Sequence, residues 1–540
     1  MLIKLQNPQL PPHSLTNRYY VYDLTFEDRC KLRELKFKFC DHERKWYTDD
    51  YLKVFQVEAL NDPQKQNYLN QKIIDIKRDK PNPAFWSNIT KFSENHNRLK
   101  PYQKAGVEQI LEYKKCILGD EPGSGKTYQS ISAMLIANSV EPKRAVIVCT
   151  ATIKDQWLQE INNYIPDFFK IIIVNNTKHN FIKEMKEDDN KHQIVIVNYD
   201  LLSLNLNRLI KDQLLEFDPH ILICDEAHYL KNMLSKRFIS IKHGLLPHWK
   251  KIELVMMVTG SPMPNRPKDL YALIRLTKPE ILGPYKDFRK FAYQYCAGRQ
   301  GKWGFEANGS SNEDELKQRL ALGNVLIRRL KEDILPQLPE KTMQLIVIEP
   351  NSKSTKILEK YEYLYDFEDI MERPNYWQKD AQLATSRKEL ALAKLDQSIQ
   401  IVIDRLEEVD KLVVFAWHRE VIEALQKALE KYKPAVITGL TKQELRQGQV
   451  DKFQKDPECK VFIGNIIAAG VGITLTASSN IEFVESSWVP EEILQAIDRC
   501  HRFGQKNAVN ARFHVVENSI DQNVLDSVIK KYKKIRKILD

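Results

Sequence analysis

Residues 116–127 read CILGDEPGSGKT and constrain the fold of this chain more than any other stretch. A short apolar run leads into a loop with three glycines, and Lys126 and Thr127 then open a segment whose apolar residues have helical spacing. Glycines allow backbone N–H groups to curl around a phosphate, and the start of a helix adds its dipole. In such loops the Lys reaches the terminal phosphates and the Thr hydroxyl ligates Mg²⁺. The stretch therefore predicts a strand, a phosphate-binding loop and a helix, as in nucleoside triphosphatases.

The phosphate-binding loop departs from the strict pattern at Asp120, where a Gly is usual. A chance glycine turn before a helix is the alternative, and the motifs farther along the chain argue against it. Upstream, Gln103 lies in RLKPYQKAGVEQIL, where an adenine-reading glutamine would precede the loop. We expect the nucleotide to be bound by Gln103, Asp120, Gly123, Ser124, Gly125, Lys126 and Thr127, together with Gly472 from the second half of the chain.

Composition places the chain among ordinary globular proteins, with 43% hydrophobic and 29% charged residues. Its 540 residues should divide into about two to four domains. There is no apolar run of about 18 residues and no secretory leader at Met1, so we expect neither a membrane span nor secretion. The eight cysteines include no C-x-x-C pair, which favours reduced, buried thiols over zinc. A net charge of +10 permits a polyanionic partner.

Residues 1–95 carry no nucleotide-binding signal and predict a small α+β module. The expected elements are a strand over 18–24, a helix capped by Thr25 and Asp28 that runs to about residue 36, and a hairpin over 37–48. Aromatic residues alternate here with lysines and arginines, which suits stacking on bases and contact with phosphates. A small core with a solvated rim explains the composition equally well, and Trp46 fits either interpretation. Residues 58–98 read as a linker with a helical piece.

Four apolar runs after the loop predict a parallel sheet covered on both faces. They span 145–149, 194–197, 221–224 and 254–258, and each ends in polar residues. Because the carboxyl ends of parallel strands share one edge, we expect the site at that edge. The third run ends in DEAH, where Asp225 can hold Mg²⁺ and Glu226 can orient and deprotonate the attacking water. The alternative is a purely structural one, in which Asp225 caps a helix and Glu226 simply follows it.

The alternation of strands and helices breaks over residues 281–345, which are rich in aromatic residues and end in VLIRRLKEDILPQLPEK. Long helices are expected over 351–410, and strands return at 412–415, 435–438, 461–464 and 481–484. A second α/β lobe is the simplest account. A basic segment, 521–540, closes the sequence, and its apolar spacing predicts a helix packed across the lobes with its cations near DNA.

The second lobe has its own polar edge. A glycine turn at 468–472 follows a strand, and QAIDRCHRFGQ places Arg499 and Arg502 three residues apart, on one face of a helix. Such a pair is usually a solvated face when it stands alone. Because a phosphate-binding loop lies on the same chain, we favour two arginine fingers that reach the phosphates from the other lobe.

Taken in order, LKPYQ, DEPGSGKT, DEAH, TGSPMPN, AAGVGITLTAS and QAIDRCHRFGQ resemble the Swi/Snf-type ATPases of helicase superfamily two. CAGRQGKWGFEANGSSNEDEL and IRRLKEDILPQLPEK look most like the HARP (HepA-related protein) annealing helicases within that family. One departure is Ile467, where relatives often carry Thr. The resemblance implies two tandem RecA-like lobes, so we expect a HARP-like module at 1–95, lobes at 96–280 and 346–520, a connection at 281–345 and a basic helix at 521–540.

The resemblance also implies an ATPase that needs ATP and Mg²⁺ and tracks along duplex, forked or branched DNA as a monomer. Lys126, Thr127, Asp225 and Glu226 would face the nucleotide from one lobe, and Arg499 and Arg502 from the other. Thr127 and Asp225 are the expected Mg²⁺ ligands. Strand contacts are expected at Thr150, Asn198 and near Gly470. The compartment would be the cytoplasm in a bacterium or virus-infected cell and the nucleus in a eukaryote.

Three other functions compete with strand annealing, branch migration or fork regression. A minimal motor of the same type could displace DNA-bound proteins without annealing. A nucleic-acid-binding scaffold with a dead ATPase is disfavoured because Lys126, Glu226 and both arginines are intact. An RNA helicase would share DEAH, but RRLKEDILPQLP and HRFGQ favour the Swi/Snf type.

Overall fold

The structure is a computed structural model of the chain. It describes every residue except 1, 6–18, 23–31, 33–37, 41–44, 49, 51, 55, 57–61, 90–92, 139–142, 187–191, 204–207, 302–303, 336–337, 363–375, 470–472 and 503. The helix predicted over 25–36 lies, apart from Leu32, outside the described residues, and so does Gly472. The side chain of Trp46 is also outside them.

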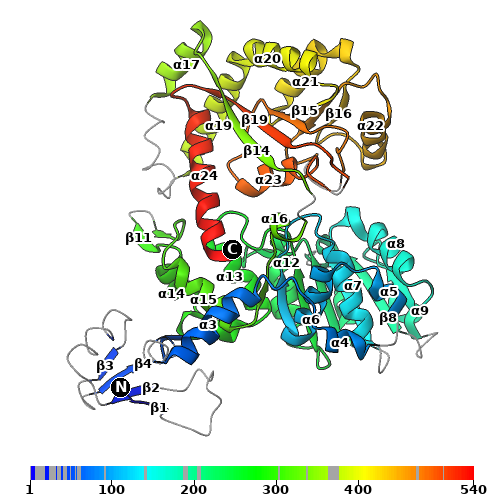
Figure 1. The fold of residues 1–540 in the computed structure, drawn as a ribbon, viewed down its shortest axis with the longest axis vertical. Helices are drawn as coiled ribbons and strands as arrows, with labels where there is room; N and C mark the ends of the chain where they lie inside the picture. The colour runs from blue at the N-terminus through cyan, green and yellow to red at the C-terminus, as the bar shows by residue number, and fades with distance from the viewer. Residues whose placement is uncertain are drawn as a thin grey trace.

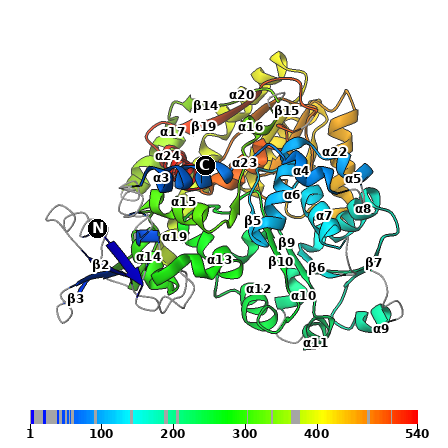
Figure 2. The ribbon, with the colours of Figure 1, turned by 60° about the horizontal axis from the view of Figure 1, so that its bottom comes forward.

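Two lobes follow one another along the chain, and α24 (Ile520–Leu539) runs from the second into the first (Figure 1). We call residues 62–335 lobe 1 and residues 341–516 lobe 2. Each lobe is a parallel sheet flanked by helices, which confirms the predicted tandem RecA-like lobes. The first strands of the chain form a separate small sheet to one side of lobe 1 (Figure 2).

The sheet of lobe 1 has seven strands, and all of its strand pairs are parallel. In sheet order they are β13 (Leu326–Ile327), β5 (Lys115–Leu118), β10 (Leu254–Val258), β9 (Ile221–Asp225), β6 (Arg144–Cys149), β8 (His192–Asn198) and β7 (Phe169–Ile173). The central strands are almost wholly buried because helices cover both faces, which is why their sequences are continuous apolar runs. The polar residues that follow them meet at one edge, as predicted.

Helices cover this sheet on two sides. One core cluster contains residues of α6 (Pro101–Tyr113), α7 (Lys126–Ala137) and α8 (Lys154–Tyr164), and the other contains residues of α11 (Arg208–Phe217), α13 (Pro267–Leu276), α14 (Phe288–Tyr295) and α15 (Glu313–Leu322). Shorter elements are α4 (Pro83–Ser87), α5 (Ser93–Asn97), α9 (Phe181–Lys186), α10 (Tyr199–Ser203), α12 (Lys236–Ile239), α16 (Lys331–Ile334) and the hairpin of β11 (Arg299–Gly301) and β12 (Gly304–Glu306).

The predicted boundary of lobe 1 at residue 280 differs from the structure. Phe291 of α14 and Leu316 of α15 share a core cluster with α13, and β13 pairs with β5 at the edge of the sheet. Residues 281–335 therefore complete lobe 1 and are not a separate insertion. The sequence concealed this because β13 is only two residues long.

The sheet of lobe 2 has six parallel strands and begins at residue 341, a few residues before the predicted start at 346. In sheet order they are β14 (Lys341–Ile348), β19 (Val509–Val516), β18 (Asn480–Phe483), β15 (Leu412–Ala416), β17 (Val461–Asn465) and β16 (Ala435–Ile437). Its helices are α17 (Ser352–Tyr361), α19 (Tyr376–Ala393), α20 (Leu395–Glu408), α21 (Arg419–Ala428), α22 (Gln443–Lys455) and α23 (Pro490–Ile497).

The N-terminal part contains an antiparallel sheet of β1 (Leu2–Leu5), β2 (Tyr19–Tyr22), β4 (Lys45–Thr48) and β3 (Lys38–Cys40), in that order. The pairing of β3 with β4 confirms the predicted hairpin, whereas β1 was not predicted. Residues 62–95 differ from the predicted module, because α3 (Pro63–Asp75) contacts α15 and Ile76 enters the core of lobe 1. Asp50 also joins lobe 1 through a buried ion pair with Arg319, at 2.7 Å.

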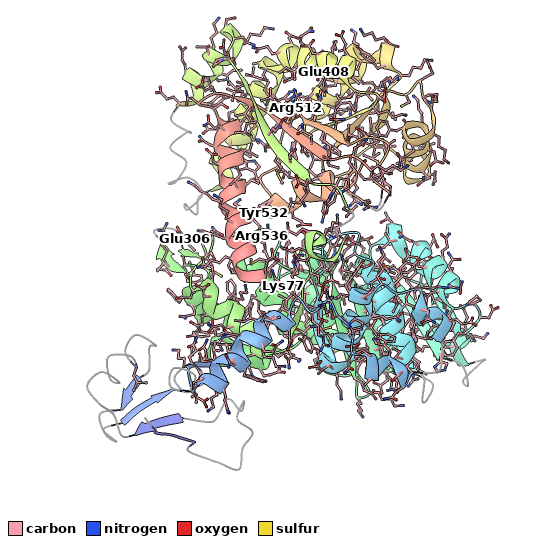
Figure 3. All side chains as sticks on the ribbon, viewed as in Figure 1. Lys77, Glu306, Glu408, Arg512, Tyr532 and Arg536 are labelled. Atoms are coloured by element: carbon pink, nitrogen blue, oxygen red, sulfur yellow. The ribbon has the colours of Figure 1, made fainter. Side chains whose placement is uncertain are left out.

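The helix α24 packs across the lobes, as predicted. Val524 belongs to a core cluster of lobe 2 and Ile538 to a cluster of lobe 1. Two of its cations form ion pairs at the surface of the protein, since Arg536, labelled in Figure 3, pairs with Glu332 at 2.7 Å and Lys537 pairs with Asp314 at 3.2 Å. These side chains remain partly exposed, and the expected position of the cations near DNA stays a prediction.

Six cysteines of the described residues are buried and form no disulfide, namely Cys116, Cys149, Cys224, Cys296, Cys459 and Cys500. Three of them, Cys116, Cys149 and Cys224, lie in strands of lobe 1, as expected. Among the helices of the described residues, none combines the length and hydrophobicity that a bilayer-spanning segment needs.

His96 makes the stability of lobe 1 depend on pH. The ring is 2% exposed beside Trp86, and burial, followed by the charge of Lys104, lowers its pKa from 6.5 to about 4. Between these values the unfolded chain binds more protons than the folded one, so stability falls as the pH drops from 6.5 towards 4. We expect the free energy of unfolding of His96→Leu to fall by about 1 to 2 kcal/mol less than that of wild type over this pH range. Urea denaturation at several pH values measures it. His248→Leu, at an exposed histidine, is the control, and parallel profiles for His96→Leu and wild type would contradict the prediction.

Candidate nucleotide site between the lobes

The loop between β5 and α7 has the backbone that a phosphate requires. Gly123 and Gly125 have φ values of 83° and 78°, a region in which side chains other than glycine are strained. Gly125 is the N-cap of α7, and no side chain caps that helix. The first N–H groups of α7 are therefore open to an anion. The Ser124 hydroxyl beside them is buried and has no hydrogen-bond partner among the described residues. These features fit a bound phosphate group.

The Lys126 ammonium lies inside this loop. Its Nζ donates to the backbone oxygen of Asp120 at 2.8 Å and to that of Glu121 at 3.2 Å. Burial lowers the pKa of Lys126, and the charges of Glu226, Asp120 and Asp225 oppose that shift. Two weakly held carbonyl contacts can be exchanged for phosphate oxygens at little cost, because a charged acceptor makes the stronger hydrogen bond.

The structure does not support the prediction that the Asp120 side chain contacts the nucleotide. It is fully buried and pairs with Arg329 at 3.0 Å. It also accepts from the Arg329 backbone N–H at 2.9 Å and from Gln129 at 3.0 Å. With its oxygens committed to these donors, Asp120 ties the loop to the chain that follows β13. This role explains an aspartate where the strict loop pattern has glycine.

Gln103 lies directly against the phosphate-binding loop. Its Nε2 donates to the Ser124 carbonyl at 3.0 Å, and its Oε1 accepts from the Lys100 N–H at 2.9 Å. A Cβ at Gly125 would lie 2.2 Å from that Nε2, so the close approach requires glycine. In this structure the amide supports the loop, and reading of adenine by Gln103 stays a prediction.

Asp225 is the last residue of β9, and Glu226 follows it at the edge of the sheet. Asp225 accepts from the Trp157 indole N–H and from the Glu226 N–H, both at 2.8 Å. Burial and the neighbouring Glu226 carboxylate raise the pKa of Asp225 to about 6. Oxygen donors such as the Thr127 hydroxyl, which opens α7, and the Asp225 carboxylate are those that Mg²⁺ prefers, and a divalent cation would lower this pKa again.

Glu226 has the environment of a carboxylate that stays ionised. Its φ is 48°, and an Oε2 of the side chain lies 3.2 Å from the Nδ1 of His228. Burial alone would raise the pKa of Glu226, but the hydrogen bond and charge of His228 and the charges of Lys126 and Arg499 outweigh it and lower the pKa. An ionised carboxylate at this edge can accept a proton from water.

The two arginines of lobe 2 lie directly after α23. Arg502 donates from Nε to the Asp498 carbonyl at 3.2 Å and from Nη1 to the Thr474 hydroxyl at 3.1 Å. Arg499 is 6% exposed, and burial followed by the charge of Arg502 lowers its pKa, whereas the charge of Glu226 raises it. Arg499 of lobe 2 and Glu226 of lobe 1 thus each favour the charged form of the other.

The remaining predicted contacts are distributed along both sheets. Thr150 is half-buried after β6, and Asn198 is 7% exposed with an Oδ1 that has no partner among the described residues. Both lie at the carboxyl edge of lobe 1, where strand contacts were expected. Ile467 is 50% exposed, and Gly470 and Gly472 fall outside the described residues.

Sequence reasoning missed several residues that hold this site together. Trp157 binds the Asp225 side chain, Tyr199 donates to the Asp225 carbonyl at 2.7 Å, and His228 faces Glu226. Arg329 and Lys331 connect the loop to the stretch after β13. In the sequence, RRLKEDILP indicated only a family resemblance and predicted no role for Arg329 or Lys331.

Two family models match this chain. A model described as SNF2-related domain matches residues 101–409, which is more than half of the chain. A model described as helicase conserved C-terminal domain matches residues 393–504. The first includes the phosphate-binding loop and DEAH, and the second includes both arginines. The two halves of the site therefore fall in the two matched domains.

Relatives match most of this chain but only part of their own length. A protein of Caenorhabditis elegans, the SWI/SNF-related matrix-associated actin-dependent regulator of chromatin subfamily A-like protein 1 homolog, is 30% identical over 80% of this chain and 61% of its own. The human DNA annealing helicase and endonuclease ZRANB3 is 31% identical over 78% of this chain and 39% of its own. The solved Sulfolobus solfataricus SWI2/SNF2 ATPase core in complex with dsDNA covers 82% of this chain and 97% of its own, at 20% identity and a TM-score of 0.38, too low for further conclusions.

Proposed function

The chain belongs to the SNF2-related family, and on that premise we propose that it is a DNA-dependent ATPase that moves along duplex or forked DNA. ATP with Mg²⁺ is the proposed nucleotide, and duplex, forked or branched DNA is the proposed partner. The proposal extends to strand annealing, branch migration or fork regression, in keeping with the name of the human annealing helicase that it resembles. We propose a monomeric motor that works in the nucleus of a eukaryote or the cytoplasm of a bacterium or virus-infected cell.

One observation carries the proposal, namely that the phosphate-binding loop and the segment of lobe 2 that bears the arginines lie close together. The backbone N–H of Lys331 donates to Glu121 of the loop, its Nζ lies 3.0 Å from Asp498 Oδ1, and Arg499 is the next residue. A carboxylate that can activate water and cations that can stabilise a transferring phosphoryl group would thus share one site, which is the pairing that phosphoryl transfer requires.

The predicted catalytic and Mg²⁺-binding residues each have a part in this scheme. The N–H groups that open α7 and the ammonium of Lys126 would bind the phosphates. A magnesium ion held by Thr127 and Asp225 would neutralise charge on those phosphates. Glu226 would orient the attacking water and accept its proton, while Arg499 and Arg502 would meet the charge that develops on the phosphoryl oxygens.

Movement follows from the division of the site between two lobes. Closure of the lobes would complete the site around ATP, and release of product would let them part. If Thr150 and Asn198 of lobe 1 hold one stretch of a strand while lobe 2 holds another, each cycle would shift the protein along the phosphate backbone. A motor that displaces DNA-bound proteins without annealing would use the same cycle and is the second candidate.

Activation of ATP hydrolysis tests the proposal directly. We expect duplex and forked DNA to stimulate turnover strongly and RNA to have little effect. Equal activation by RNA and DNA would favour an RNA helicase, and the absence of stimulation by every nucleic acid would contradict the proposed function.

Removal of residues 1–48 separates annealing from the motor. This truncation deletes β1–β4 but keeps Asp50, which pairs with Arg319, and α3, which packs on lobe 1. A deletion of 1–95 would instead remove Ile76 from the core. We expect duplex-stimulated ATPase to persist, because the site lies entirely within the lobes, and annealing and the preference for forks to be lost. Annealing at the full rate would instead favour a motor that needs no module.

A further inference from the structure

Lys331 joins the phosphate-binding loop to the helix of lobe 2 that precedes the arginines. It is the first residue of α16 and lies four residues beyond the end of the strand β13, which pairs with β5. Its backbone N–H donates to the Glu121 carboxylate at 2.7 Å. A Cβ at Gly123 would lie 3.7 Å from Lys331 Cε and 4.0 Å from its Nζ. The backbone of Lys331 is thus bonded to the phosphate-binding loop of lobe 1, and the end of its side chain lies beside that loop.

The ammonium of Lys331 reaches lobe 2. Its Nζ lies 3.0 Å from Asp498 Oδ1 and donates to the His501 carbonyl at 3.1 Å. Lys331 is 3% exposed, and Asp498 is also buried at 3%. Loss of either partner would leave the other charge buried without a counter-charge, so the pair favours this arrangement of the two lobes.

Asp498 sets the position of both arginines. It immediately precedes Arg499, and its backbone carbonyl accepts from Arg502 Nε at 3.2 Å. A displacement of Asp498 would therefore move both guanidinium groups. Stabilisation of a transition state is steeply sensitive to such movement, and a shift of about 1 Å can lower turnover by about 10²-fold.

We propose that Lys331 is a positioning residue for hydrolysis: it holds Asp498, and through it Arg499 and Arg502, in register with the phosphate-binding loop. This inference rests on the proposed ATPase function and gives a role to the RRLKED stretch. Direct binding of phosphate by Lys331 is the competing role. It is disfavoured because the ammonium already has an anionic partner and a carbonyl partner in lobe 2.

Steady-state kinetics with wild type, Lys331→Met, Asp498→Asn and the double variant test this inference in the full chain with saturating duplex DNA. We expect each single variant to lower kcat by about 10- to 100-fold. The KM for ATP should change by less than about threefold, because the nucleotide itself loses no contact. The double variant should be no worse than the poorer single variant within about twofold, because both changes remove one interaction. Lys331→Arg, which keeps a cation, should recover most of kcat.

Arg536→Met is the matched control, since Arg536 (Figure 3) also pairs with α16 from another element, through Glu332, and makes no ion pair or hydrogen bond with Asp498 in the described part of the chain. It should retain kcat within about twofold. Thermal unfolding and affinity for a fluorescent ATP analogue are measured for every variant. If Lys331→Met does not fold, the kcat and KM of Asp498→Asn and Lys331→Arg are compared with those of wild type instead.

Several outcomes would overturn the inference. A rise in KM or a loss of ATP affinity in Lys331→Met with kcat intact would make Lys331 a nucleotide ligand. Additive losses in the double variant, or an equal loss in Arg536→Met, would mean that the Lys331–Asp498 pair has no special part. If wild type itself hydrolyses no ATP with DNA, the proposed function fails, whereas an active wild type with an unaffected Lys331→Met defeats only this inference.

Discussion

Arg502→Ala is expected to lower DNA-stimulated ATP turnover by about 10³ to 10⁵-fold, the range seen when an arginine finger is missing. The side chain is held by the Asp498 carbonyl and the Thr474 hydroxyl of its own lobe, so its guanidinium would meet the nucleotide only on closure of the lobes. DNA affinity should stay near the wild-type value, because strand contacts are expected elsewhere. Single-turnover hydrolysis and DNA binding, measured on the same preparation, check both statements.

Arg405→Ala is a suitable control for Arg502→Ala. Arg405 pairs with Glu408 on α20, far from the gap between the lobes (Figure 3), and its loss should leave turnover unchanged. An equal fall of DNA binding and ATP turnover in Arg502→Ala would identify an arginine that contacts the DNA backbone and not the nucleotide.

Local patterns in the sequence predicted the parts of the fold that local physics determines. Continuous apolar runs between helices can be satisfied only in a sheet covered on both faces, so both parallel sheets were predicted. Gly123 and Gly125 occupy left-handed backbone that favours glycine, so the loop could be recognised from its spacing. Asp225 and Glu226 come at the end of a buried apolar run, which placed them at the correct edge.

Contacts between distant parts of the chain could not be predicted from the sequence. Asp120 was expected to face the nucleotide, but its partner is Arg329, about two hundred residues later. No periodicity can reveal such a pair, because each residue reads locally as an ordinary loop or strand-end residue. The two-residue strand β13 was hidden for the same reason, and with it the fact that residues 281–335 complete lobe 1. The ion pairs of Arg536 with Glu332 and of Lys537 with Asp314 were hidden for the same reason, since these carboxylates lie on other elements.

Glu226→Gln is expected to slow hydrolysis by about 10² to 10⁴-fold while ATP binding persists, because the amide keeps the shape of the side chain but cannot accept a proton. The position supports that separation, since His228, Lys126 and Arg499 all favour the ionised carboxylate that the amide removes. Lys126→Ala should behave differently and weaken ATP binding itself, as the ammonium lies inside the phosphate-binding loop.

The contrast between the two variants is the decisive measurement. Binding of a fluorescent ATP analogue should be normal in Glu226→Gln and impaired in Lys126→Ala, with little turnover in either. Glu253→Gln, at a half-exposed carboxylate that pairs with Lys143, should match wild type. Near-normal turnover in Glu226→Gln would remove this residue from catalysis.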